Sequence, residues 1–408
     1  MFRLWKIAIR DLGRNKRRSG LTLVAVALGL ALLVVTSSLM EGAVADSIEN
    51  NIRVKTGHVQ IRNASYDEDK ASLKWEDLLE NPQEQVARAL ALPQVRVATP
   101  VVWASGILAT GEESVGVRVF GIDPLSETAV PFQEGLVAGQ FLTPDDRSGI
   151  LIGQRLAESL GIGAGHDVSL LINTSDEQPD EAIFTVRGLY DTGTPAYDET
   201  TIFLPLTKAQ AFARTPDRAS AVVMLLHDQD DAEAVAAALQ APGLELLTWL
   251  DLNQVVIQAV DMSQGIMYLM YLVVLAVVAV VIANTLLMSV FERTREMGIL
   301  AALGMKGRQI LAMFVMEAGT LAVLGIILGI LLGCLGVYYL ATEGLYIGEA
   351  AAGAASADVA YGDTLYARFS LSETVTLSVA GLLITLLASL YPAWFAARME
   401  PIDALRAL

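Results

Sequence analysis

Apolar and polar residues are unevenly distributed along the chain, and four long stretches carry no charged side chain. These runs contain 22, 30, 25 and 24 residues and cover 19–40, 262–291, 318–342 and 374–397. A helix needs about 20 predominantly apolar residues to cross roughly 30 Å of hydrocarbon. The pattern therefore predicts four transmembrane helices, at 19–41, 262–291, 318–342 and 374–397.

The first apolar run could instead be a signal peptide. It follows a basic segment, and "AVA" at 43–45 resembles a cleavage site. The apolar region of a signal peptide is usually only about 7–15 residues long, however. The length of this run favours an uncleaved membrane anchor.

The segment 42–261, between the first and second spans, has mixed patterns that predict an α+β domain. Helical patterns alternate with short runs rich in β-branched residues. We expect a strand–helix–strand unit split between 54–121 and 220–248, with an inserted β-rich subdomain at 122–218. The predicted strands are Val54–Ile61, Val117–Ile122, Val168–Ile172, Ile183–Tyr190 and Ala221–Leu226, and the predicted helices are Pro82–Leu92, Gln154–Leu160, Leu206–Ala213 and Asp230–Leu239.

A polar stretch, "FERTREMGILAALGMKGRQI" at 291–310, separates the second and third apolar runs. Met297 and Leu300 share one helical face with Gly304, and charged residues are concentrated at the start. Glycine tolerates the left-handed conformation that ends many helices. The pattern predicts a short amphipathic helix at 292–304. A second interfacial helix is predicted at 1–18, where aromatic and aliphatic residues alternate with basic ones.

The distribution of charged residues predicts how the chain is oriented in the membrane. Residues 1–19 contain seven Lys or Arg against one Asp, and residues 292–316 contain four Lys or Arg. The segment 343–372 contains four Asp or Glu and one Arg. Because positive loops stay in the cytoplasm, we expect both termini and the polar stretch inside, with 42–261 outside.

Composition also excludes several classes of function. The chain is 53% apolar yet carries a net charge of −17, and this acidity argues against nucleic-acid binding. The three histidines are far apart in the sequence, and the pattern predicts no metal site. No Gly-Lys dipeptide occurs, so the phosphate-binding motif GxxxxGK[ST] is absent from the sequence. We therefore expect no enzyme activity and no cofactor in this chain.

Several segments in order resemble the MacB/FtsX/LolC-type ABC transporter permeases, closest to the lipoprotein-releasing LolC/LolE type. The resemblance rests on "RNKRRSGLTLVAVALG" (14–29), "ERTREMGILAALGMKGRQI" (292–310), "MFVMEAGTLAVLGIILGILLG" (313–333) and "YPAWFAARMEPIDALR" (391–406). In the outer segment, "VFGIDP", "LIGQRLAESLGIGAGHDVSL" and "FTVRGLYDTG" are similar to the family's periplasmic core.

The resemblance implies a function and partners. Such permeases sit in the bacterial inner membrane and transmit ATP binding and hydrolysis by a separate ATPase, which holds the Mg-ATP, to a periplasmic domain. It implies an FtsX-like permease domain at 262–408 and a second subunit, either the same chain or a paralogue. It also implies that the helix at 292–304 contacts the ATPase through Glu292, Arg293, Arg295, Glu296, Met297, Gly298, Ile299, Leu300, Leu303 and Gly304, with Met297 and Leu300 as buried anchors.

Two further sets of residues are candidates for packing and for cargo. Gly325, Gly329 and Gly333 repeat at every fourth position, a spacing that lets membrane helices pack closely. An entry site for lipidated cargo is expected between two subunits, with Ser37, Leu39, Met267, Met270 and Tyr271 as candidates. Membrane lipids are expected neighbours of this site.

Other functions remain open at this point. MacB-like efflux of periplasmic substrates and FtsX-like regulation of a cell-wall hydrolase are the alternatives to lipoprotein release. Ten residues separate two predicted strands at 173–182, where LolC-like subunits carry a longer hook that recruits a lipoprotein chaperone. Recruitment of a periplasmic chaperone by this chain is therefore an open question.

Overall fold

The computed structural model describes residues 16–67, 71–111, 113–348 and 364–398. The chain divides into two compact units. We call the unit of residues 1–44, 260–345 and 365–408 the helical unit, and that of residues 45–259 and 346–364 the α+β unit. Most of the helix predicted at 1–18 lies outside the described residues.

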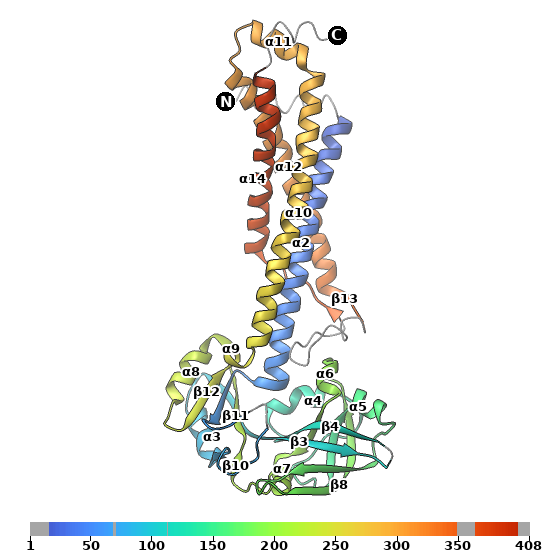
Figure 1. Cartoon of the computed structure of the whole chain (residues 1–408), viewed down its shortest axis with the longest axis vertical. Helices are drawn as coiled ribbons and strands as arrows, with labels where there is room; N and C mark the ends of the chain where they lie inside the picture. The colour runs from blue at the N-terminus through green and yellow to red at the C-terminus, as the bar shows by residue number, and fades with distance from the viewer. Residues whose placement is uncertain (1–15, 68–70, 112, 349–363, 399–408) are drawn as a thin grey trace. The chain divides into compact units, whose positions relative to one another are not determined.

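Four long helices dominate the helical unit (Figure 1). They are α2 (Lys16–Asn51), α10 (Gln254–Glu292), α12 (Gly307–Thr342) and α14 (Leu371–Ala397). Each is long and apolar enough to cross a membrane. Both α2 and α10 extend past the predicted apolar limits, at 41 and 262, because the polar residues beyond those limits continue the helix without a proline.

Glycines let α12 approach α2 closely. A methyl group at Gly325 would lie 2.7 Å from Val26 Cγ1, and one at Gly329 would lie 2.9 Å from the carbonyl oxygen of Ala27. Gly333 faces Val34 in the same way. The repeated small-residue face is thus occupied by a helix of the same chain.

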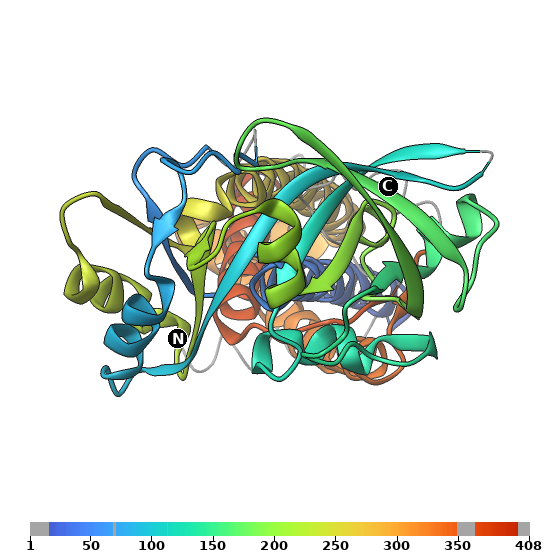
Figure 2. The ribbon, with the colours of Figure 1, turned by 90° about the horizontal axis from the view of Figure 1, so that it is seen from below.

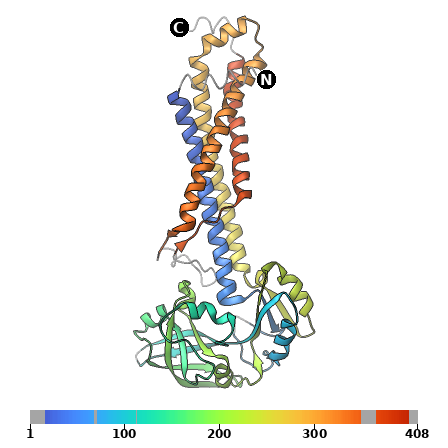
Figure 3. The same ribbon diagram turned by 180° about the vertical axis from the view of Figure 1, so that it is seen from behind.

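The helical unit also contains the short helix α11 (Thr294–Ala302), which connects α10 to α12. Two short strands, β13 (Leu345–Tyr346) and β14 (Thr364–Leu365), pair with each other where the chain passes from one unit to the other and back (Figure 3). The chain entering α14 is tied to α2, because the backbone N–H of Arg368 donates to the carbonyl of Ser38.

The α+β unit is built on one ten-stranded mixed sheet of order β12-β1-β11-β3-β4-β9-β6-β8-β5, with β7 paired to β3 and β8. Long strands cross this unit in Figure 2. The strands are β1 (Val59–Asn63), β3 (Val95–Ala109), β4 (Ser114–Ile122), β5 (Leu136–Gly139), β6 (Gly149–Gly153), β7 (Asp167–Asn173), β8 (Pro179–Tyr190), β9 (Thr201–Pro205), β11 (Ala221–Leu226) and β12 (Leu244–Thr248). A separate pair is formed by β2 (Leu79–Glu80) and β10 (Arg218–Ala219).

The strand β3 joins the two parts of this sheet. Its first half pairs with β11, up to Val101 opposite Ala221, and its second half pairs with β4, from Val102 opposite Gly121. One apolar core lies around β1 and β11, and a second lies around β6 and β9. The division between the two parts therefore runs along β3, rather than at the predicted boundary of 122.

Short helices accompany the strands of the α+β unit. They are α3 (Pro82–Leu90), α4 (Val130–Glu134), α5 (Gln154–Ser159), α6 (Pro195–Asp198), α7 (Leu206–Ala213), α8 (Ala232–Leu239) and α9 (Trp249–Leu252), with 3₁₀ turns η2 (Glu127–Ala129) and η3 (Gln229–Asp231).

The predicted strand Val54–Ile61 is wrong in its first half. Residues Ile52–Thr56 form a π-helix, η1, and the strand β1 begins only at Val59. The wide turn is stabilised by the N–H of Gly57, which donates to the carbonyl of Ile52, and by the hydroxyl of Thr56, which donates to the carbonyl of Asn51. Gly57, with φ of 64°, then turns the chain into the strand.

A buried carboxylate organises the turn between β8 and β9. Asp198 is 1% exposed, and its two carboxylate oxygens accept hydrogen bonds from the backbone N–H and the hydroxyl of Thr192. Burial raises the pKa of Asp198 from 3.8 to about 7, although the bonds from Thr192 oppose the shift. The nearby Asp191 adds to the increase.

This pKa shift predicts a pH-dependent stability. The folded state holds a proton that the unfolded state releases near pH 4. The contribution of Asp198 to the free energy of unfolding is therefore fully present below that pH. It is lost as the pH rises towards 7.

Replacing Asp198 with Asn keeps both contacts to Thr192 without the charge. We expect Asp198→Asn to raise the thermal stability at pH 8, by as much as about 4 kcal/mol, and to change it little at pH 4. Thermal unfolding of the full chain in detergent measures this, and an equal effect at both pH values would contradict it.

Candidate coupling site

The short helix α11 begins and ends with clear local signals. Arg293 precedes it in a non-helical conformation, and α10 continues through Glu292. At the other end Gly304 adopts φ of 94°, the N–H of Met305 donates to the carbonyl of Leu300, and that of Gly304 donates to Ala301. This paired arrangement is a Schellman motif. The helix therefore covers Thr294–Ala302, shorter at both ends than the predicted 292–304.

One face of α11 is buried within the chain itself. Met297 is 2% exposed and belongs to an apolar cluster with Val290 of α10, Phe314 of α12 and Ala393 of α14. Gly298 beside it is also buried. The expectation that Met297 is an anchor for a partner protein is thus wrong, because its side chain is already enclosed by α12 and α14.

The opposite face of α11 is open and apolar. Ile299 is 46% exposed and Leu303 is 79% exposed, whereas Leu300 is half-buried. Arg295 and Gly304 are exposed beside them. A solvated loop would not need such a surface; Ile299 and Leu303 are the large apolar side chains of this segment that are exposed.

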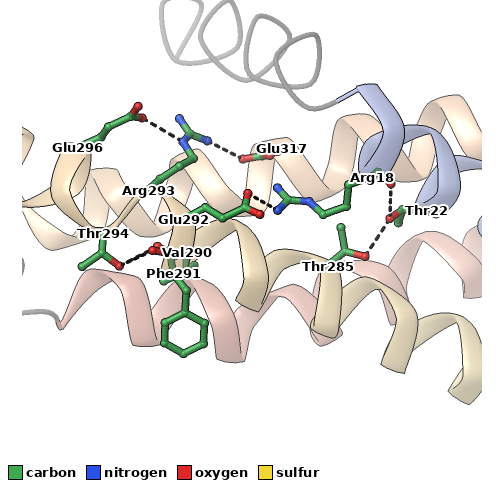
Figure 4. Close-up of polar contacts among 10 residues, drawn as sticks. All are labelled: Arg18, Thr22, Thr285, Val290, Phe291, Glu292, Arg293, Thr294, Glu296 and Glu317. Atoms are coloured by element: carbon green, nitrogen blue, oxygen red, sulfur yellow. Dashed lines mark hydrogen bonds and ion pairs between the residues drawn. The ribbon is translucent and has the colours of Figure 1, made fainter. Parts of the chain in front are cut away.

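Arg293 connects the start of α11 to the next long helix (Figure 4). Its guanidinium lies 3.3 Å from the carboxylate of Glu296 and 3.5 Å from that of Glu317 on α12. The side chain of Glu317 is 6% exposed and that of Arg293 is 17% exposed. The pairing gives a partner to an acidic residue within an apolar helix, where an isolated charge would be costly.

A second set of polar contacts joins α2 to α10 (Figure 4). Arg18 lies 2.7 Å from the carboxylate of Glu292, and the hydroxyls of Thr22 and Thr285 are 2.9 Å apart. Sequence reasoning missed these contacts. Their partners are 274 and 263 positions apart, and a single sequence carries no signal that would pair them.

The candidate cargo residues lie together in the helical unit. Leu39, Met267 and Met270 are partly buried and pack against a buried cluster that contains Tyr271 and Leu33. Ser37 is buried, at 6% exposed. The exposed apolar residues of α10 include Ile266, Leu269 and Val273 instead.

The described part of the chain contains no cluster of three or more His, Cys, Asp or Glu side chains that could hold a metal ion. The chain's single cysteine, Cys334, is a free thiol in α12.

Comparison with protein families decides what kind of protein this is. Residues 19–241 match the MacB-like periplasmic core domain, and residues 268–401 match the FtsX-like permease C-terminal domain. The chain belongs to the FtsX-like permeases with a MacB-like periplasmic core domain. These two matched regions include α11, α12 and α14, most of α2 and α10, and most of the α+β unit, and members of this family serve ABC transporters.

Curated relatives of this permease cover nearly the whole chain. It is 25% identical to "Lipoprotein-releasing system transmembrane protein LolC" of Neisseria meningitidis over 96% of both chains. It is 25% identical to LolE of Haemophilus influenzae over 94% of this chain and 92% of that protein. It is 26% identical to "Macrolide export ATP-binding/permease protein MacB" of Nitrobacter winogradskyi over 98% of this chain and 59% of that protein.

The two faces of α11 predict different mutant phenotypes. We expect Met297→Glu to destabilise the permease by about 3 kcal/mol or more, because it places an unpaired charge in an apolar cluster. We expect Leu303→Glu to leave stability nearly unchanged, because that side chain is exposed. Thermal unfolding of both variants in detergent compares them. Equal unfolding temperatures would contradict the assignment of the two faces.

Proposed function

We propose that this chain is the membrane subunit of an ABC transporter that converts ATP binding and hydrolysis by a separate ATPase into movement of its α+β domain. The cargo we propose is lipoprotein, released from the bacterial inner membrane. The chain itself performs no catalysis. It works as one of two permease subunits, the other being a second copy or a paralogue.

One observation carries this proposal. The helix α11 presents Ile299 and Leu303 on its open face, while Met297 on the other face packs against α12 and α14. Force applied to the open face therefore reaches two membrane helices directly. The relative MacB supports the nature of the partner, because its name describes an ATP-binding part and a permease in one protein.

The proposed orientation follows from charge. We place both termini and α11 in the cytoplasm and the α+β unit in the periplasm, because the short segment between α10 and α12 carries the exposed basic residues Arg295, Lys306 and Arg308. An ATPase that approaches from the cytoplasm then meets α11. A periplasmic α+β unit also accords with its match to a MacB-like periplasmic core domain.

The open face of α11 is the place to test the proposed coupling. We expect Leu303→Glu to abolish co-purification of a cytoplasmic ATPase, because a desolvated apolar anchor commonly contributes about 2 kcal/mol or more to an interface. Leu303→Met, which keeps an apolar side chain of similar size, should retain the ATPase. Purification of the tagged chain from membranes, with identification of co-eluting proteins, measures this. If the ATPase remained bound to the Leu303→Glu variant, the proposed coupling role of α11 would be contradicted.

The proposed cargo rests on the LolC and LolE relatives and on the apolar surface of α10. The acyl chains of a lipoprotein must leave the bilayer sideways, and each buried methylene contributes about 0.8 kcal/mol. An exposed row on α10, including Ile266, Leu269 and Val273, offers such chains an apolar path towards a second subunit.

We do not assign chaperone recruitment to the hairpin between β7 and β8. Ser175 at its tip donates its N–H to the carbonyl of Ala213 and its hydroxyl to that of Arg214. Arg214 also pairs with Asp180 at 3.0 Å. These contacts hold the hairpin against the end of α7, so it does not project as a hook.

Photo-crosslinking from adjacent positions tests the cargo. We expect a photoreactive residue at Ile266 to capture lipidated protein when ATP is absent. The same residue at Met267, which is partly buried against the apolar cluster of the helical unit, is the adjacent control and should capture less. Analysis of the products for lipid identifies the cargo. Capture of soluble peptides or drugs alone would instead indicate MacB-like efflux.

A further inference from the structure

The interface between α2 and α10 changes from apolar to polar at the end closest to α11. Val26 of α2 and Ile282 of α10 belong to one buried apolar cluster. Next along the interface, the hydroxyls of Thr22 and Thr285 lie 2.9 Å apart (Figure 4). Polar groups therefore continue the interface where the apolar contact ends.

Two polar atoms beyond this contact are buried and unpaired. Nε of Arg18 and Oγ of Ser289 have no hydrogen-bond partner among the residues that the structure describes, and Ser289 as a whole is 1% exposed. Another nitrogen of the same guanidinium, Nη1 of Arg18, lies 2.7 Å from the carboxylate of Glu292. Buried polar groups of folded proteins almost always have a partner, so a partner for these two atoms is expected.

The two atoms lie at the same level of the interface. The helices α2 and α10 run in opposite directions, because the contacts of Arg18, Thr22 and Gly29 fall at successively earlier positions of α10. Arg18 is four residues before Thr22, and Ser289 is four residues after Thr285. At 1.5 Å per residue, each therefore lies about 6 Å beyond the contact between the two threonines, on the side of α11.

Ser289 also lies on the side of α10 that contacts α2. Residues three and four apart share a helical face, so Ser289 shares one with Thr285 and Glu292, which both contact α2. Its side chain is small, whereas the preceding turns carry the larger Ile282 and Leu286 in the apolar cluster. A serine at this position leaves space beside its hydroxyl that a larger side chain would fill.

We propose that one buried water molecule binds between α2 and α10, where it accepts a hydrogen bond from Nε of Arg18 and bonds to the hydroxyl of Ser289. The Nε–H group only donates, while a hydroxyl both donates and accepts. Water meets both needs and is small enough for a site between packed helices. A halide ion also accepts both bonds, but the carboxylate of Glu292 beside Arg18 disfavours a second negative charge. The inference concerns this chain alone and does not rest on the proposed function.

The water completes the contact between α2 and the chain that leads into α11. The carbonyl of Ser289 accepts the N–H of Arg293, the residue that precedes α11. Ser289 thus contacts this segment through its backbone and α2 through its hydroxyl and the water. A buried donor without a partner is costly, so the water stabilises this end of α2 against α10.

A crystal structure of the full chain in lipid, at a resolution that shows ordered waters, tests the site directly. We expect one density peak about 2.7–3.2 Å from both Nε of Arg18 and Oγ of Ser289. Crystals grown with bromide in place of chloride identify a halide, because bromide scatters anomalously. An anomalous peak at the site, the absence of any peak, or a direct bond of either atom to another protein group would overturn the proposal.

Unfolding measurements test the link between the two side chains. Ser289→Val removes the hydroxyl and fills the space beside it with an apolar group, so Nε of Arg18 loses its partner. We expect the unfolding temperature of the full chain in detergent to fall by about 2 °C or more. Ser289→Ala keeps the space and the water, and should lower the unfolding temperature less.

A second background separates a shared water from the general effect of a substitution in a packed interface. Arg18→Leu removes Nε altogether, so no buried donor is left without a partner. We expect Ser289→Val to lower the unfolding temperature less than half as much in Arg18→Leu as in the parent chain. Ser389→Val is the matched control, because the buried hydroxyl of Ser389 donates to Leu386 in its own helix, and its shift should be the same in both backgrounds. Equal shifts for Ser289→Val in the two backgrounds would show that Arg18 and Ser289 share no ligand, and would overturn the proposal.

Discussion

The packing of Met297 between α12 and α14 is the contact on which the organisation of the helical unit depends. A helix of nine residues has little stability of its own in water. Once Met297 and Gly298 are buried, α11 is held at a defined angle to the long helices, and its opposite face is fixed in position. The buried pair of Arg293 and Glu317 adds a directional tie at the first turn. Packing thus holds this short segment in a defined position against the long helices.

Much of the architecture could be predicted from the sequence because it follows from strong periodic signals. Long uncharged runs predicted four membrane helices, and the strand at Ala221–Leu226 and the helix at Leu206–Ala213 have the bounds that were expected. Weaker signals failed where tertiary contacts override local propensity. The segment from Val54 has the composition of a strand, yet its first residues continue the preceding helix as η1 because Thr56 and Gly57 stabilise the wider turn.

The sequence predicted which segment forms the candidate site, but not which of its side chains are buried. The pattern of charges and apolar residues identified the segment 292–304 as a short amphipathic helix. The pattern could not say which apolar residue is buried, because Met297, Ile299 and Leu303 all fit an apolar surface. Met297 is the buried one because it packs against Phe314 of α12 and Ala393 of α14. The same reason hides the pairing of Arg18 with Glu292. Residues of the predicted cargo site, such as Met267, are partly buried against side chains of other helices, which only the folded chain brings together.

The glycine face of α12 has a consequence for how two such subunits can associate. Val26, Ala27 and Val34 of the same chain already pack against Gly325, Gly329 and Gly333. This close helix contact therefore lies within the subunit and is not available to a neighbour. A neighbouring subunit or a lipid tail therefore meets large, branched side chains such as Ile266 and Val273. Lipid is as apolar as these side chains, and exchanging one for the other changes the free energy little. Contacts made on this surface would therefore be more readily exchanged than the packing of α12 against α2.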